Sequence, residues 1–516
     1  MIRLTKISTM IFLSLGIAFA QFQPETKEEL QTAVNLWVSD NTSALSSYGE
    51  INTWDVSLIT DMSNLFENKT TFTSNISNWN TSNVTDMRFM FHRASTYDQN
   101  MDSWDLSSVT SMAGMFKEAS SFNQNISNWD VSNVTDMSKM FWGASSFNQN
   151  ISNWNVSNVI GMNAMFKEAV VFNQSLNNWN VASVVDMGFM FDRATNFNSD
   201  ISSWDVSSVV STAHMFQYAS NFNGDISNWN VSSVQQMQGM FDSATNFNSD
   251  LSSWDVSSVV YFDTVFRNAT SFNSDISSWD VTSALQMAAM FMNATNFNSD
   301  ISSWDMTSVT TISIMFNGAE SFNQPIGLWD VTNIIDMNNT FGGAISFNQD
   351  LTSWDVSGVQ HMANLFNRCS SFNGDISNWD VSGITNMAGF FYKATAFNQD
   401  ISSWDVSSVT NMGNMFAFAE SFNQDISSWN INNVTGMNNI FYQTDGPSDE
   451  VSCAINASWS SNPNWPYDWS DDCYTFENKE ELVTAVDLWI SDSVSSASTY
   501  GNINTWNVSL ITDMSE

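Results

Sequence analysis

The sequence has little positive charge, little proline and almost no cysteine. Only 14 of its 516 residues are Lys or Arg, against 53 Asp or Glu, so the formal net charge is −39 at pH 7. Proteins bind nucleic-acid phosphates through clusters of Lys and Arg, so this balance argues against a nucleic-acid partner. An acidic surface suits a soluble extracellular protein, and it also leaves open the binding of divalent cations such as Ca²⁺.

After residue 20, no stretch has the roughly 18 consecutive apolar residues that a transmembrane helix needs. Residues 1–20 have the features of a secretory signal peptide. Arg3 and Lys6 precede a short apolar run, and Ala18-Phe-Ala20 fits a cleavage site with small residues. We therefore expect a secreted or surface-displayed protein without a transmembrane segment.

The three cysteines fall into two groups. Cys369 occupies a position that is Ala in other copies of a repeat, which predicts a small buried side chain. Cys453 and Cys473 lie in a polar, proline-containing stretch outside the repeats. In a secreted protein these two predict a disulfide.

A 25-residue unit fills most of the chain, and residues 126–150 are a clear copy. Trp54 begins a column with a Trp at every twenty-fifth residue as far as Trp429, and Phe66 begins a second column that ends at Phe441. Sixteen units follow one another without insertion or deletion. Such regularity predicts units that bury their apolar faces against their neighbours.

The pattern within one unit suggests a strand and a helix. Apolar residues around Trp129-Asp130-Val131 have the spacing of a leucine-rich repeat, which predicts a short parallel strand. Met137, Met140, Phe141 and Ala144 follow the i, i+3, i+4, i+7 spacing of a short amphipathic helix. The predicted fold is therefore an α/β repeat solenoid, leucine-rich-repeat-like, with sixteen such units.

Helical segments are expected to flank the array. Thr26 can cap a helix whose apolar face is Leu30, Ala33, Val34 and Trp37, and this helix would cover the first unit. Residues 479–489 repeat that pattern, which suggests that a second cap and a second, truncated array begin there. The expected division is: signal peptide 1–20, N-terminal cap 21–53, array 54–445, disulfide-bearing linker 446–473, and second cap with array start 474–516.

The repeat resembles that of BspA-like leucine-rich-repeat surface proteins. The shared motif is Trp-Asp-Val-Ser-x-Val-Thr-x-Met-x-x-Met-Phe-x-x-Ala-x-x-Phe-Asn-Gln, seen clearly at Trp404-Asp405-Val406-Ser407 and Phe122-Asn123-Gln124. The resemblance covers about residues 22–445 and 475–516. It implies a secreted or surface-displayed protein that is not an enzyme, with adhesion or ligand binding assigned to some members. Family members are often lipoproteins, whereas no lipid-attachment Cys lies near the expected cleavage site.

The residue after each column Trp is Asp or Asn in all sixteen units. On the predicted strand this column lines the concave face, and it could bind Ca²⁺ or a ligand there. The alternative is that each side chain caps a turn through backbone N–H groups. The candidate ligand-binding and metal residues are the uninterrupted acidic run Asp255, Asp280, Asp305, Asp330, Asp355, Asp380 and Asp405.

Other columns favour structural roles. The Asn column that includes Asn123 and Asn148 predicts an amide ladder, and the Met and Phe columns predict a core. A Ser/Thr column beside the Asp column could in principle order water, but Ser and Thr are also ordinary turn residues.

Departures from the repeat, such as His92, His214 and His361, are scattered and assemble no nucleophile, base and orienting group. The hypothesis is therefore a non-enzymatic surface protein that binds a protein or glycan through its concave face. The alternatives are a cation-bridged matrix protein and, third, a polysaccharide-acting enzyme.

Overall fold

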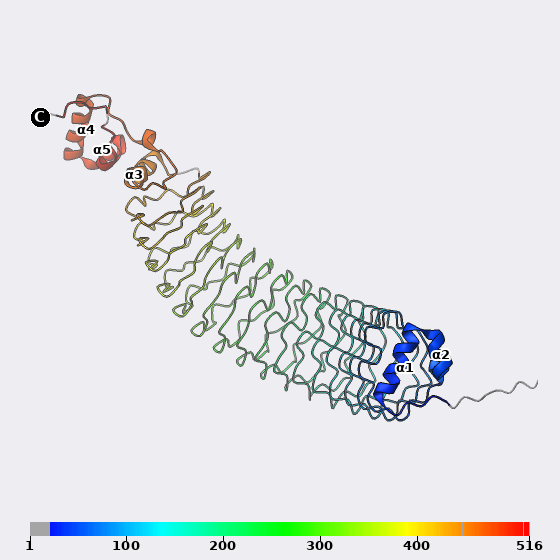
Figure 1. Cartoon of the computed structure of the whole chain (residues 1–516). Coiled ribbons are helices and arrows are strands. Elements are labelled where there is room, and N and C mark those ends of the chain that lie inside the picture. The colour runs from blue at the N-terminus through cyan, green and yellow to red at the C-terminus, as the bar shows by residue number, and fades with distance from the viewer. Residues whose placement is uncertain (1–20, 445–446, 509, 515–516) are drawn as a thin grey trace, which may run out of the picture.

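The computed structural model describes residues 21–444, 447–508 and 510–514, so the predicted signal peptide 1–20 lies outside the described residues. The chain forms a bent rod of stacked 25-residue coils with helices at both ends (Figure 1). The helices are α1 (Lys27–Ser39), α2 (Asn41–Tyr48), α3 (Asp449–Trp459), α4 (Lys479–Ser491) and α5 (Ser493–Tyr500), with short 3-10 turns η1 (Ile51–Thr53), η2 (Ser470–Asp472) and η3 (Ile503–Thr505). Among these described helices, none is long and apolar enough to cross a membrane.

The prediction of an α/β solenoid of the leucine-rich-repeat type is wrong. Over the described residues no strand forms, and neighbouring coils share at most an isolated parallel bridge, such as that between Asp136 and Gly161. The expected strand fails because its backbone turns sharply at both ends. Trp129 N–H donates to Ile126 O at 3.2 Å, and Val134 N–H donates to Val131 O at 3.0 Å. These N–H groups therefore serve local turns, and no strand-to-strand ladder develops.

The expected helix at 137–144 is also absent, although its apolar face is buried as predicted. Lys139 and Gly143 have φ angles of 62° and 72°, in the left-handed region. The equivalent two residues have positive φ in every unit, which an α-helix does not tolerate. The spacing of the core residues is thus produced by consecutive tight turns, because such turns can also bring every third or fourth side chain to one side.

Hydrogen bonds between coils run in one direction along this stretch. Alternate N–H groups donate to carbonyl oxygens of the following coil, while the intervening N–H groups close the local turns. In the unit 126–150 the donors are Met137, Lys139, Phe141 and Gly143, and the acceptors Gly161, Asn163, Met165 and Lys167, at 2.7–3.0 Å. The backbone is thereby satisfied without regular secondary structure.

The core is a set of columns that run the length of the rod. Each Trp from Trp79 to Trp429 is buried, and its indole N–H donates to the backbone carbonyl 28 residues earlier at 2.8–3.2 Å. Burial of one such aromatic side chain contributes roughly 1.5–3 kcal/mol. The Trp column therefore both packs the interior and joins each coil to its predecessor.

At each end of the rod, side chains of the flanking segment form hydrogen bonds with backbone groups of the terminal coils. At the first coil, Gln31 of α1 donates its side-chain amide to Leu65 O at 3.0 Å. At the last coil, the Tyr467 hydroxyl accepts from Phe441 N–H at 3.1 Å, and the Asn462 amide donates to Ile431 O at 2.8 Å. Helix α1 forms where the sequence predicts, with the Thr26 hydroxyl accepting from Glu29 N–H.

The segment after the array is more structured than a linker. Trp459 of α3 lies 6.2 Å from Trp429, ring centre to ring centre, and continues the Trp column by one step. A disulfide joins Cys453 of α3 to Cys473. Helices α4 and α5 repeat the arrangement of α1 and α2, and Cys369 is a buried free thiol.

Candidate functional site

The predicted Asp column lies on the surface and serves the turns. All seven candidate residues are exposed, and one carboxylate oxygen of each accepts the N–H two residues later at 2.9–3.1 Å. The same bond forms at the Asn members of the column, for example between Asn230 and Ser232 at 3.2 Å. Turn capping, the structural alternative considered from the sequence, is thus the role that the geometry displays.

Hydrogen bonds also set the acidity of this column. The Ser257 hydroxyl donates to Asp255 at 2.6 Å and, with the Ser257 N–H, lowers the pKa of that carboxyl. Asp305, Asp355, Asp380 and Asp405 have lowered pKa values for the same reason. Within the described ranges, no three His, Cys, Asp or Glu side chains converge as a metal site requires. Binding of Ca²⁺ by this column stays a prediction.

The distance between neighbouring coils differs from one column to the next. Ring centres of successive Trp residues are 6.5 Å apart at Trp229 and Trp254, whereas Phe216 and Phe241 are 5.8 Å apart. Hydrogen-bonded backbones lie about 4.8 Å apart. The bonded run and the Asp column therefore lie on different stretches of each coil. We call the side that carries the bonded run the inner side and the side that carries the Asp column the outer side, as names for these two sets of residues.

All Lys and Arg residues of the array lie on this inner side. In register with the unit 126–150, they occupy only positions equivalent to 138–144, within or directly after the bonded run. They are Lys69, Arg88, Arg93, Lys117, Lys139, Lys167, Arg193, Arg267, Arg368 and Lys393. We call the exposed residues at positions equivalent to 138, 139, 142, 143 and 145 the inner face.

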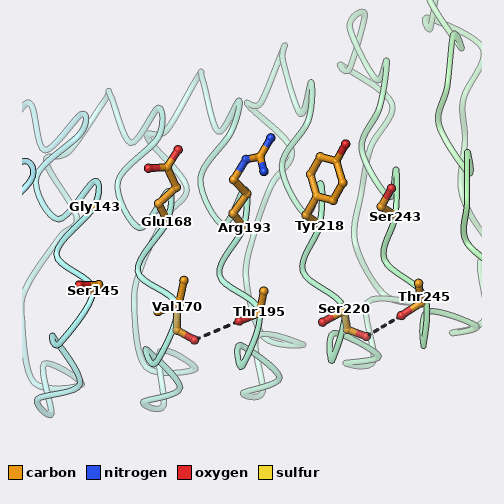
Figure 2. Close-up of a pocket in the computed structure, with 10 residues that line it drawn as sticks. All are labelled: Gly143, Ser145, Glu168, Val170, Arg193, Thr195, Tyr218, Ser220, Ser243 and Thr245. Carbon is orange, nitrogen blue, oxygen red and sulfur yellow. Dashed lines mark hydrogen bonds between the residues drawn. The ribbon is translucent and has the colours of Figure 1, made fainter. Parts of the chain in front are cut away.

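A groove of about 690 Å³ crosses the inner face over five coils. Figure 2 shows Glu168, Arg193 and Tyr218 side by side along one edge, projecting in the same direction. The other edge carries Ser145, Val170, Thr195, Ser220 and Thr245. The Arg193 guanidinium lies 4.4 Å from the centre of the Tyr218 ring, a cation–π contact that orders both side chains. The groove thus offers a charged and aromatic edge opposite a mostly hydroxyl-bearing edge.

Two buried carboxylates, each paired with a partly exposed cation, lie next in sequence to residues that line this groove. Lys167 pairs with Asp192 at 2.6 Å, and Arg267 pairs with Asp242 at 2.5 Å. Burial raises the pKa of Asp192 despite Lys167, and burial lowers the pKa of the neighbouring His214. Paired, buried charges of this kind fix side-chain positions more than they add stability.

Matches to one protein family cover most of the chain. Five overlapping stretches match a family model described as "Mycoplasma protein of unknown function, DUF285": residues 35–141, 124–225, 198–303, 286–383 and 362–452. The chain belongs to the DUF285 family. No curated protein matches the chain. The DUF285 matches support the tandem repeat, and they assign no activity to it.

Sequence reasoning did not single out the inner face of this DUF285 protein. Arg193, Tyr218 and Glu168 are absent from the Asp column on which the prediction rested. The available signal was the position of residue-type variation: Trp, Val, Met and Phe columns scarcely change, while the position of Tyr218 also holds Arg, Glu, Gly and Asn in other units. Positions whose side chains neither pack in the core nor cap a turn are the ones that can vary in this way.

Proposed function

We propose that this DUF285 protein is a secreted or surface-displayed binding protein that holds a protein or glycan partner along its inner face and so acts in adhesion. The observation that carries the proposal is the confinement of every array Lys and Arg to the inner side, at positions equivalent to 138–144. A long curved face of repeated units suits a partner that makes many weak contacts. The resemblance to BspA-like surface proteins supports the same function.

Extracellular placement is part of the proposal. The Cys453–Cys473 disulfide suits an oxidising compartment, and residues 1–20 have the composition of a signal peptide. We assign no catalytic role, since no group of inner-face residues combines a nucleophile, a base and an orienting partner.

The experiment compares two surfaces of the same molecule. Beads that carry the full chain are tested for retention under flow on mucin and on laminin. The double variant Arg193→Gln, Tyr218→Ser alters the groove edge, and the matched control Asp255→Asn, Asp280→Asn, Asp305→Asn alters the outer side but keeps turn-forming side chains. We expect retention on at least one coating, a loss of threefold or more for the inner variant, and no change for the outer control. No retention above uncoated glass, or a loss only in the outer control, would contradict the proposal.

The second candidate function is a cation-bridged matrix, which the uniform Asp column favours. Carboxylates of two molecules could share Ca²⁺ ions between exposed columns. This function requires light scattering from a solution of the protein to rise on addition of Ca²⁺ and to fall again with chelator. The Asp→Asn control above removes three of the eleven carboxylates of the column and should reduce that rise.

A further inference from the structure

A second hollow lies farther along the inner face and differs in chemistry from the groove of Figure 2. It has a volume of about 460 Å³ and is lined mainly by amides and glycines, with Arg368, Glu320 and Tyr392 on the same lining. The amide and glycine residues are Asn293, Asn317, Asn339, Asn367, Gly318, Gly342 and Gly343. Sites for small ligands have volumes of roughly 300–1,000 Å³, so the hollow is of the right size for one.

The floor of the hollow is built so that two amides can lie across it. Gly342 is buried, and a Cβ atom placed on it would come 2.0 Å from Asn339 Oδ1 and 2.6 Å from Asn317 Nδ2. One acceptor and one donor therefore meet above a residue that lacks a side chain. Both amides are half-buried, and neither has a side-chain hydrogen bond to another described residue. Half-buried amides are costly to leave unpaired, so this pair is suited to a ligand or to water.

We propose that this hollow binds a neutral oligosaccharide; the inference deepens the proposed binding function and rests on it. Sugar hydroxyls donate and accept at once, and so do Asn side chains. Tyr392 adds an aromatic ring of the kind that packs against the apolar face of a ligand while its hydroxyl remains available.

The same features disfavour a peptide. An extended peptide is held by free backbone N–H and C=O groups at a sheet edge. Here those groups are taken by adjoining coils, as in the bonds from Gly318 N–H to Gly342 O at 2.7 Å and from Gly343 N–H to Asn367 O at 2.6 Å. The hollow also lacks a deep apolar pocket, since Ile345 on its lining is exposed.

The chain supplies a matched pair of variants. Gly342→Ala puts a methyl group between the two amides, and Gly342 has no left-handed backbone angle to oppose the change. Gly383→Ala makes the same change where no atom lies within 4 Å of the added Cβ. Both should leave the fold intact, which circular dichroism and the thermal unfolding midpoint check.

Saturation-transfer difference NMR with the full chain tests binding directly. The probes are maltotetraose, cellotetraose, mannotetraose and the N-acetylglucosamine tetramer, with trigalacturonate and a hexapeptide of Gly and Asn for comparison. We expect transfer to the ring protons of at least one neutral tetrasaccharide, at least fivefold weaker in Gly342→Ala and unchanged in Gly383→Ala.

Two results would overturn the oligosaccharide site: no transfer to any neutral probe, or equal transfer in the two glycine variants. Transfer to the hexapeptide alone would assign the hollow to peptides and overturn it equally. The bead experiment measures adhesion through the Arg193–Tyr218 groove and uses no substitution in this hollow. Adhesion that persists while all neutral probes fail therefore refutes the sugar site and leaves the proposed function standing.

Discussion

The packing of His214 over Gly239 gives a prediction that the structure makes quantitative. A Cβ atom on Gly239 would lie 2.3 Å from His214 Nδ1, and Gly239 has a φ of +63°. Ala in a left-handed conformation costs roughly 1–2 kcal/mol. Overpacking against the ring adds about 1–3 kcal/mol. Gly239→Ala should therefore cost about 2–5 kcal/mol alone, but only about 1–2 kcal/mol in a His214→Ala background, where the ring is gone.

Native-state hydrogen exchange is the appropriate assay, because long repeat arrays need not unfold in one step. The amide of Gly239 donates to Asp263 O at 2.9 Å, so its exchange reports the opening of this coil. A double-mutant cycle then isolates the steric contribution of the ring. Equal costs of Gly239→Ala in both backgrounds, with a coupling below about 0.5 kcal/mol, would refute the reasoning.

Three further predictions follow from the columns and the disulfide. Trp254→Phe removes the 3.0 Å indole hydrogen bond to Ile226 O and should destabilise its coil by about 2 kcal/mol. Asp255→Ala removes the cap of an exposed turn and should cost less, under about 1 kcal/mol. Hydrogen exchange around residues 226–256 ranks the two variants, and the reverse order would contradict this prediction. Folded-state pKa values of Asp255, Asp305, Asp355 and Asp405 lie below the ordinary value, so the turns contribute stability that is complete above about pH 4 and is lost as pH falls through those lower pKa values. Replacing all four by Asn should flatten the dependence of the unfolding midpoint on pH between 5 and 2, and an unchanged slope would count against this account. Reduction of Cys453–Cys473 should speed exchange in α3 and η2 while the coils before Trp404 keep their protection, and uniform loss of protection would contradict a local role.

The sequence predicted the repeat, its register, the buried columns and the N-terminal helix, but not the local backbone. The spacing of Met137, Met140, Phe141 and Ala144 is shared by a helix and by consecutive turns with left-handed residues. Periodicity reports which side chains face inwards, and it cannot report the sign of φ at Lys139. Some evidence for the turn is present in pairs of residues one unit apart. Phe89 is followed 25 residues later by Gly114, and His214 by Gly239, and in each pair the ring lies over the glycine. Such pairs become interpretable only once the coils are known to stack in register.

The candidate site was predicted less well for a related reason. The Asp column was chosen because it was regular, yet regularity here marks turn formation, as the bond from Ser257 N–H to Asp255 shows. The residues that line the groove, such as Arg193 and Tyr218, are at positions where the residue type varies between units. Their grouping depends on the direction in which turns expose side chains, which requires the folded backbone.

The recurring hydrogen bonds between coils have a consequence for how such a protein can change in length. Junctions along the rod repeat one pattern, in which the bonded run donates to the following coil, as from Lys139 N–H to Asn163 O, and the Trp indole donates to the preceding coil. Removal or duplication of a whole 25-residue unit therefore leaves all junctions of one kind and both end covers in place. A gain or loss of whole units in the gene therefore keeps the structure of the junctions and changes only the distance between the two ends of the rod. A lineage can adjust the reach of the molecule in steps of one coil, while each added coil brings a fresh set of inner-face positions on which new specificity can be selected.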